Sequence, residues 1–356
     1  MTSLTTLWLA AAGAVLLGAA MLRLPGPRAV PLPDRWHRTV TPITGGIAIF
    51  GAFVIALQPP FISGAIDDRY FPLLVGATIA FGLGLWDDAR SIGVPAKLVG
   101  QLAIALGAAS IGVRPDWLPD WAGIPVAFVI LVASMNSLNL LDNTDGLAAG
   151  IAGIAACGLA LVGGLVSGAG SPVVAAALAG ACFGFLPFNY RWRRPAALFM
   201  GDSGSHLLGF ALGGLALLAS PGGAGGAAAA VAAPLLILAV PALDTGLVML
   251  GRFGEGRPVW QGGRDHSSHR LVYHGLSERK AVAVLLAIAA NCTAVAVALV
   301  ILHDPLLTAI AVGTTVAGLI AFASQLVVIS EYGSGALIAL EPTSLEHVEG
   351  RDARLG

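Results

Sequence analysis

The sequence contains the stretch Asn136-Ser-Leu-Asn139-Leu-Leu-Asp142-Asn-Thr-Asp145-Gly146, which ends an apolar run that begins at Ile124. Its two amides and two carboxylates recur every three residues. Because three residues fall about 60° short of a full helical turn, these side chains do not share one face of an α-helix. We therefore expect a helix that ends within the stretch and turns at the glycine. Such a helix end presents oxygen ligands, which suit Mg²⁺ and the phosphates it bridges, where membrane meets water.

The composition around this stretch is that of a membrane protein. The chain has 356 residues, of which 56% are hydrophobic and 11% are charged. Soluble domains carry about 25% charged residues. We therefore expect an all-α polytopic integral membrane protein. The net charge of −1 and the lack of basic stripes argue against nucleic acid as a partner.

Apolar runs of sufficient length predict eleven transmembrane helices, approximately at residues 4–22, 43–58, 71–86, 97–113, 123–141, 146–167, 173–189, 203–219, 231–250, 281–302 and 306–329. With the N-terminus outside, only Arg69 and Arg114 of the 19 Lys and Arg residues lie on the outer side. This distribution follows the positive-inside rule. We expect one transmembrane domain over residues 1–330, with its polar loops in the cytoplasm, and a cytoplasmic tail over residues 331–356.

The same orientation places three further polar motifs on the cytoplasmic side. Asp87-Asp88 ends the third run, and Gly201-Asp202-Ser-Gly-Ser205 opens the eighth. The acid pair is either a solvated helix end or a pair of carboxylates beside a metal and phosphate. The second motif is either an ordinary N-cap or a helix start that binds phosphate oxygens while Asp202 binds the metal.

The third motif is a cytoplasmic loop that contains Arg264, His266, His269 and Arg270. Zinc is a weaker candidate for this loop, because no cysteine is nearby and basic residues crowd it. A mixed cluster of arginine, histidine and serine is better suited to a pyrophosphate or nucleotide. A loop that only orients the chain is the third alternative.

In this order the motifs resemble those of the polyprenyl-phosphate N-acetylhexosamine-1-phosphate transferases, from about Arg35 to His274. The family's Asp-Asp pair falls on Asp87 and Asp88, and its Gly-Asp-x-Gly-Ser falls on residues 201–205. Its Asn-x-x-Asn-x-x-Asp-Gly-x-x-Gly pattern falls on residues 136–146. There Asn143 replaces the first glycine. In the family's His-x-His-His motif, Ser268 replaces the middle histidine.

The resemblance implies roles for the matched residues. Asp202 and Asn139 would bind Mg²⁺, for which Mn²⁺ is a candidate substitute. The residues expected to be catalytic are Asp87, Asp88, Asp142 and Asp145. Those expected to bind substrate are Asn136, Asn139, Phe199, which would stack on uracil, Arg264, His266, His269 and Arg270.

The segments flanking the histidines resemble those of the GlcNAc-1-phosphate branch. The implied reaction transfers N-acetylhexosamine 1-phosphate from a UDP-sugar to a polyprenyl (undecaprenyl) phosphate and releases UMP. It would be the first membrane step of a cell-envelope glycan pathway, catalysed at the cytoplasmic face of the inner (plasma) membrane. A homodimer is compatible with the sequence.

Other functions are alternatives to this reading. The same chemistry can use another UDP-sugar or the muramoyl-pentapeptide donor. A transporter places ionisable residues near the bilayer midplane, whereas the acids here cluster at one face. A non-catalytic scaffold has no need of Mg²⁺ or of these aspartates.

Overall fold

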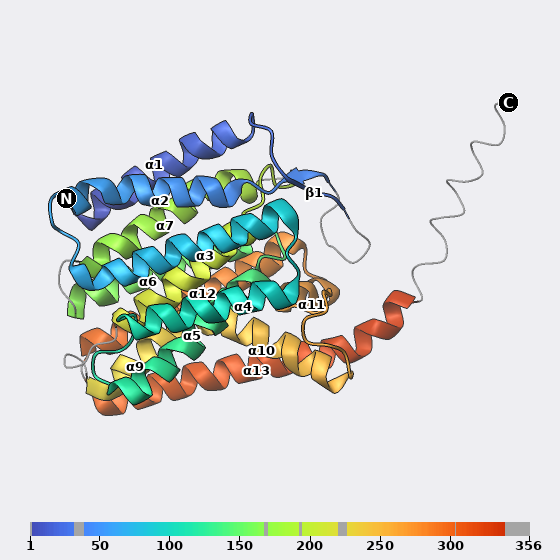
Figure 1. Ribbon diagram of the computed structural model, residues 1–356. Coiled ribbons are helices and arrows are strands. Elements are labelled where there is room, and N and C mark those ends of the chain that lie inside the picture. The colour runs from blue at the N-terminus through green and yellow to red at the C-terminus, as the bar shows by residue number, and fades with distance from the viewer. Residues whose placement is uncertain are drawn as a thin grey trace.

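The computed structural model describes residues 2–31, 39–166, 170–191, 194–219, 226–302 and 304–338. In this part the chain is nearly all helical, and the long helices run side by side in one bundle (Figure 1). Two short strands, β1 (Arg28–Ala29) and β2 (Thr41–Pro42), pair antiparallel at one end of it. The predicted all-α polytopic membrane protein is confirmed.

The first helices are α1 (Ser3–Met21), α2 (Gly45–Ile62), α3 (Phe71–Arg90), α4 (Val94–Ser110), α5 (Asp120–Leu141), α6 (Leu147–Val166), α7 (Gly170–Asn189) and α8 (Gly201–Leu218). The chain continues as α9 (Gly226–Ile237), α10 (Ala239–Gly254), α11 (Ser267–Tyr273), α12 (Glu278–Leu302) and α13 (Pro305–Ile338). A short 3₁₀ turn, η1 (Asp68–Tyr70), precedes α3. Helix α13 continues past the predicted boundary at residue 330, and residues 339–356 lie outside the described residues.

Within the described residues, eight helices are long and apolar enough to cross a membrane. A ninth span results if α9 and α10, which are bent by 68°, are counted as one. Each of the eleven predicted runs overlaps a helix or this bent pair. The difference in number arises because α4 has only 17 residues and α8 opens with a polar turn. The number of spans and their orientation stay predictions.

Helix α8 forms the centre of the bundle. Every residue from 203 to 218 is buried, and the helix packs against α2, α3 and α5. Gly84 of α3 permits the closest of these approaches, because a Cβ at that position would lie 2.2 Å from the carbonyl oxygen of Asp202. The first turn of α8 is thereby held directly against the last turns of α3.

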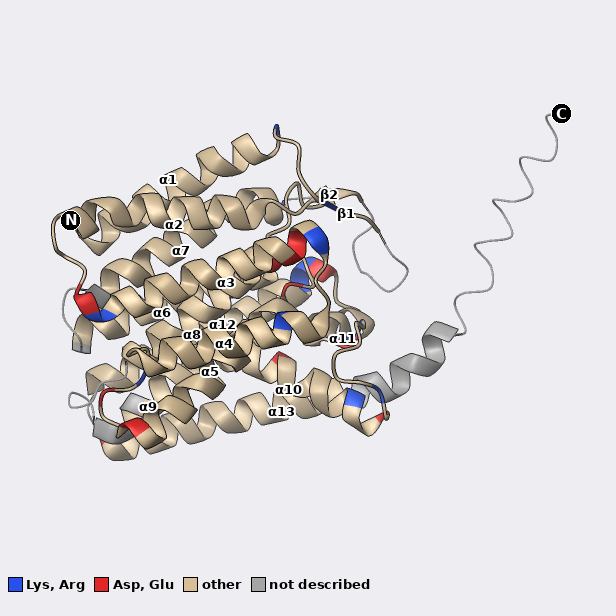
Figure 2. Cartoon of the chain, in the orientation of Figure 1, with Lys and Arg blue, Asp and Glu red and all other residues tan. Residues whose placement is uncertain are grey.

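Charged residues gather at the ends of the bundle and are sparse between them (Figure 2). The group at the end that carries β1, β2 and α11 is the denser one. This end also receives the last turns of α3 and α5 and the first turn of α8. The polar motifs of the sequence therefore meet at one end of the bundle.

Candidate active site

The stretch at the end of α5 folds as its sequence predicts. Helix α5 ends at Leu141, and the N–H of Asp142 donates the last helical bond to the carbonyl of Leu138 at 3.2 Å. The chain then turns at Gly146, whose φ of +82° lies in the left-handed region that favours glycine. Helix α6 begins at the next residue, so the two carboxylates lie in a short loop between helices.

Lys97 of α4 joins two of the predicted motifs. Its ammonium lies 2.7 Å from Asp87 Oδ2 and also forms an ion pair with Asp202 Oδ2. Asn139 donates from Nδ2 to the other oxygen of Asp202 at 2.5 Å and to Ser205 Oγ at 3.0 Å. Sequence reasoning assigned Lys97 only to the orientation signal and missed this position. The ends of α3 and α5 and the starts of α4 and α8 therefore converge on Asp202.

Asp88 contacts the start of α8 in a different way. Its Oδ1 accepts from the N–H of Asp202 at 2.8 Å, and its Oδ2 accepts from the N–H of Ser203 at 3.0 Å. No side chain from α8 itself caps this helix start. A carboxylate from α3 therefore occupies these two N–H groups, and the predicted local N-cap is wrong. Phosphate binding at this helix start stays a prediction.

The two carboxylates of the α5–α6 loop have different surroundings. Burial, with the nearby negative charges of Asp202, Asp145 and Asp88, raises the pKa of Asp142 to about 8. Asp145 accepts a hydrogen bond from the backbone N–H of Ala196 at 2.9 Å, and burial raises its pKa as well. Asp145 therefore tethers the segment before α8, while Asp142 is the carboxylate most crowded by other acids.

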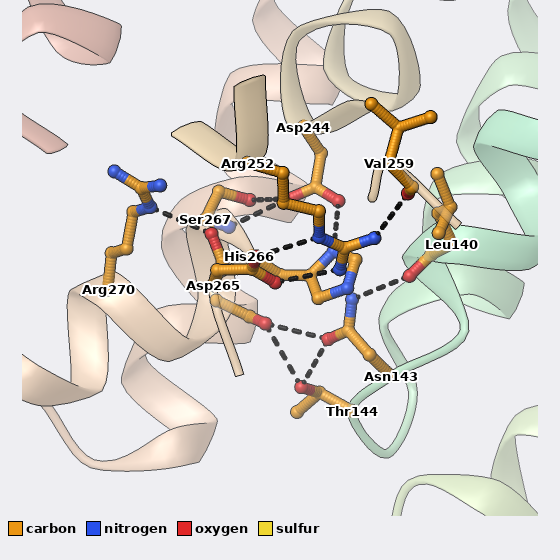
Figure 3. Close-up of polar contacts among 11 residues, drawn as sticks. Leu140, Asn143, Thr144, Asp244, Arg252, Val259, Asp265, His266, Ser267 and Arg270 are labelled. Carbon is orange, nitrogen blue, oxygen red and sulfur yellow. Dashed lines mark hydrogen bonds and ion pairs between the residues drawn. The ribbon is translucent and has the colours of Figure 1, made fainter. Parts of the chain in front are cut away.

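Asp244 of α10 fixes the predicted histidine segment. Its carboxylate lies 2.8 Å from His266 Nδ1 and accepts from the N–H and the hydroxyl of Ser267 at 2.7 and 2.6 Å (Figure 3). Asp244 is fully buried, so these contacts compensate for its charge. The carboxylate engages Nδ1, so Nε2 is the ring nitrogen that does not contact Asp244. His269 packs edge-on against His266, with ring centroids 5.6 Å apart.

The arginines near these histidines have structural partners. Arg252 is 1% exposed and binds Asp265 through two bonds of 2.8 and 2.9 Å (Figure 3). Burial raises the pKa of Asp265, but hydrogen bonding to Arg252, with the positive charges nearby, offsets that effect and holds the pKa at about 2. Arg270 donates to the carbonyls of Asp265 and Leu326, which joins α11 to α13. Arg264 is exposed on the loop.

A cavity of about 1230 Å³ lies at this end of the bundle. Nine predicted residues line it: Asp87, Asp88, Asn139, Asp142, Asp145, Phe199, Asp202, His266 and His269. Lys97 and several cations that were not predicted as site residues also line it, among them Arg28, Arg191, Arg194 and Arg279. Carboxylates and cations therefore share one cavity that is large enough for a nucleotide sugar.

Three predicted substrate-binding residues, Asn136, Arg264 and Arg270, are not part of the cavity wall. Asn136 donates to Gln101 Oε1 at 3.0 Å, and Gln101 in turn contacts His206 at 2.8 Å. Gln101 and His206 are at most 1% exposed. These side chains form a polar layer between α4, α5 and α8, and they support the residues that line the cavity.

The chemistry of the donors near Asp202 fits a hard divalent cation. Asp87 and Asp202 already share the positive charge of Lys97. A half-turn of the Asn139 carboxamide exchanges its nitrogen for an oxygen that faces Asp202. Within the described ranges, no group of three or more His, Cys, Asp or Glu side chains is placed to hold a metal ion. The ammonium of Lys97 forms ion pairs with two of the nearby carboxylates, those of Asp87 and Asp202.

Known proteins resemble this chain along most of its length. The family described as glycosyl transferase family 4 matches residues 70–220. A "Probable undecaprenyl-phosphate N-acetylglucosaminyl 1-phosphate transferase" of Bacillus subtilis is 30% identical and covers 72% of each chain. A "Decaprenyl-phosphate N-acetylglucosaminephosphotransferase" of Mycobacterium tuberculosis is 31% identical, over 73% of this chain and 72% of its own length.

A "Phospho-N-acetylmuramoyl-pentapeptide-transferase" of Desulforudis audaxviator is 32% identical over 59% of this chain and 75% of its own. The matched family segment contains Asp87, Asp88, the whole α5–α6 loop and Asp202. These are the residues that the fold brings to one cavity. The protein therefore belongs to glycosyl transferase family 4, as its motifs predicted.

Proposed function

We propose that the protein transfers N-acetylhexosamine 1-phosphate from a UDP-sugar to a polyprenyl phosphate, with GlcNAc 1-phosphate as the favoured group. One observation carries the proposal: carboxylates of α3, α8 and the α5–α6 loop surround a cavity whose wall also holds arginines and a histidine pair. The printed names of the Bacillus and Mycobacterium relatives support the same chemistry. The products would be a polyprenyl-diphospho-sugar and UMP.

In the proposed reaction an oxygen of the acceptor phosphate attacks the phosphorus that carries the sugar. The bond between the two donor phosphates breaks, and its electron pair leaves with UMP. Asp87 would take or position the acceptor proton, because it faces the cavity beside Lys97. Asp88 would act by positioning Asp202, since both of its oxygens accept backbone N–H groups.

The UDP-sugar would bind the part of the cavity wall that contains His266 and His269. His266, oriented by Asp244, would contact the nucleotide sugar through Nε2, beside His269. Arg191, Arg194 and Arg279 line the same cavity and would bind phosphate oxygens. Phe199, which also lines it, would stack on the uracil.

Asp202 and Asn139 would hold the metal, with Mg²⁺ as the expected ion and Mn²⁺ as a candidate substitute. When bound, the ion would offset the charge that builds as the phosphoanhydride breaks. Lys97 would then neutralise the carboxylates that the ion does not reach. We further propose that the cavity faces the cytoplasm at the inner membrane, because nearly all Lys and Arg lie at that side of the predicted spans.

Purified protein in detergent, with undecaprenyl phosphate, Mg²⁺ and a panel of UDP-sugars, tests the proposal. UMP release and sugar in the lipid phase are expected with UDP-GlcNAc, and both should be lost with EDTA and in Asp202→Asn. The matched control is Asp67→Asn, an exposed aspartate before η1. Turnover only with the UDP-linked muramoyl-pentapeptide would move the protein to the activity named for the Desulforudis relative. Folded protein that turns over no donor would overturn the proposal.

A further inference from the structure

Asn143, Thr144 and Ser268 form a small polar ring between the α5–α6 loop and α11. The hydroxyl of Ser268 donates to Asn143 Oδ1 at 2.7 Å and lies 3.1 Å from Thr144 Oγ1. Thr144 also donates to Asn143 Oδ1 at 2.8 Å, and Asn143 Nδ2 donates to the carbonyl of Leu140 (Figure 3). The ring therefore connects the last turn of α5 to the first turn of α11 across more than a hundred residues of sequence.

Two members of this ring are the positions where the chain departs from its family's pattern. Asn143 stands where the pattern has glycine, and Ser268 stands where it has histidine. An asparagine and a serine side chain together contain as many non-hydrogen atoms as a histidine side chain and a glycine. Since Ser268 is 1% exposed, the space around it is closely limited. The side chains of Asn143 and Ser268 are in contact and therefore share one confined space.

The ring lies between two parts of the cavity wall. Asp142 and Asp145 flank its first two members in the sequence, while His266 and His269 flank Ser268. Asn143 and Thr144 line the cavity, whereas Ser268 is not part of its wall. A substitution of Ser268 can consequently affect a bound molecule only by moving neighbouring residues. Its effect therefore reports on the positions of those residues.

We propose that Asn143, Thr144 and Ser268 form a latch that sets the distance between the metal-side loop and the donor-side histidines. In this latch Asn143 and Ser268 are a coupled pair of positioning residues. The inference rests on the proposed function, because it assigns the two sides of the cavity to metal and donor. It goes beyond that function in naming residues that have no assigned contact with the metal or the donor and still determine how tightly the donor binds.

The first test is the kinetics of Ser268→Ala. The variant leaves Asn143 Oδ1 without one donor, and we expect the KM for UDP-GlcNAc to rise about tenfold while kcat changes less than about threefold. Ser268→Thr keeps the hydroxyl but adds a methyl group where space is limited, so its KM should rise less than that of Ser268→Ala. Thr293→Val is the matched control, because its buried hydroxyl on α12 has no hydrogen-bond partner among the described residues, and it should leave both constants unchanged. An unchanged KM in Ser268→Ala would overturn the latch.

The second test is an exchange of side chains. Ser268→His alone forces a larger ring against Asn143 and should lower kcat/KM by about a hundredfold. Adding Asn143→Gly makes room for the imidazole, so the double variant should recover to within about tenfold of wild type. If the double variant is no better than the product of the two single effects, the two positions are not coupled and the proposal fails.

A readout independent of turnover separates this inference from the proposed function. Thermal unfolding of Asn143→Ala, Ser268→Ala and the double variant forms a cycle in which the double variant should lose clearly less in Tm than the sum of the single losses. Wild-type protein that turns over no donor would overturn the proposed function, and the cycle would still decide whether the two residues are coupled. Additive losses in Tm would overturn the latch, whatever the activity.

Discussion

Asp88 on α3 accepts a hydrogen bond from the backbone N–H of Asp202 on α8 at 2.8 Å, and it thereby fixes the residue that Lys97 and Asn139 also bind. Asp88, which caps α8, is thus hydrogen-bonded to the backbone of Asp202, the residue expected to bind the metal. A substitution of Asp88 is therefore expected to displace Asp202 through the backbone of α8.

Asp88→Asn should impair both activity and stability. The amide keeps one acceptor but turns an NH₂ group toward a backbone N–H, which leaves a buried donor unmatched. We expect the free energy of unfolding to fall by about 2 kcal/mol and kcat to fall by about a hundredfold, since small displacements of a catalytic group cost about that much. Thermal unfolding and UMP-release kinetics measure the two effects. Equal losses in Asp68→Asn, an exposed acid at the start of η1 and at the other end of α3, would contradict the explanation.

Gly84→Ala should separate α3 from α8. A Cβ at this position would meet the carbonyl oxygen of Asp202 at 2.2 Å, so the helices must move apart at the site. We expect a destabilisation of about 1–3 kcal/mol together with a loss of activity. Gly82→Ala is the control on the same helix, because its Cβ would meet nothing within 4 Å. If the two variants have the same Tm and activity, the close approach of α3 and α8 is not needed for stability or activity.

The free energy of unfolding should depend on pH through His269. Burial lowers the pKa of His269 to about 3, whereas an unfolded histidine titrates near 6.5. Between these values the unfolded chain binds a proton that the folded chain does not, so the free energy of unfolding decreases as the pH falls. The decrease approaches about 1.4 kcal/mol per pH unit well below 6.5.

Thermal unfolding of wild type and His269→Gln between pH 7.5 and pH 5 measures this contribution. The difference between the two proteins isolates it, because the raised pKa of Asp142 gives a slope of opposite sign in both of them. The variant should lose less stability than wild type on acidification. Parallel curves would mean that His269 is charged or exposed in solution.

Mg²⁺ should displace a proton from the site. At pH 7 Asp142, whose pKa burial and the neighbouring carboxylates raise to about 8, is mostly protonated. A divalent cation nearby favours its ionised form, so binding should release up to about one proton. Calorimetric titration with Mg²⁺ in two buffers of different ionisation enthalpy measures the release. Asp142→Asn should bind Mg²⁺ with little release, and equal release from both proteins would assign the proton to another group.

Local sequence patterns predicted much of the site. The three-residue spacing from Asn136 to Asp145 does not keep all four polar side chains on one helical face, and α5 does end within this stretch, at Leu141. The positions of the helices follow from the length of the apolar runs. Both features depend only on residues that are close together in the sequence, so the sequence pattern is enough to predict them.

The contacts that unite the site depend on long-range packing and were not predictable. Lys97 reaches Asp87 because the chain reverses after α3, with Ser91 and Gly93 at positive φ, and no motif marks such a reversal as functional. Arg252 and Asp265 form an ion pair across a loop. The positive charges of this loop are also explained by the positive-inside rule, so the sequence did not indicate the pairing. Sequence reasoning could name both residues as charges, but it could not choose their partners.

The two sides of the cavity are held in different ways. The segment before α8 is joined to the start of α2 by backbone hydrogen bonds, since the N–H groups of Gly45 and Gly46 donate to the carbonyls of Phe199 and Met200 at 2.9 Å. The histidine segment is held chiefly by side chains, through Asp244, Arg270 and the ring around Ser268. Substitutions can therefore shift the histidine segment one residue at a time, whereas the main-chain hydrogen bonds between α2 and the segment before α8 do not depend on side-chain identity. In the proposed function, the donor would therefore be bound by the part of the cavity wall whose position depends most on individual side chains.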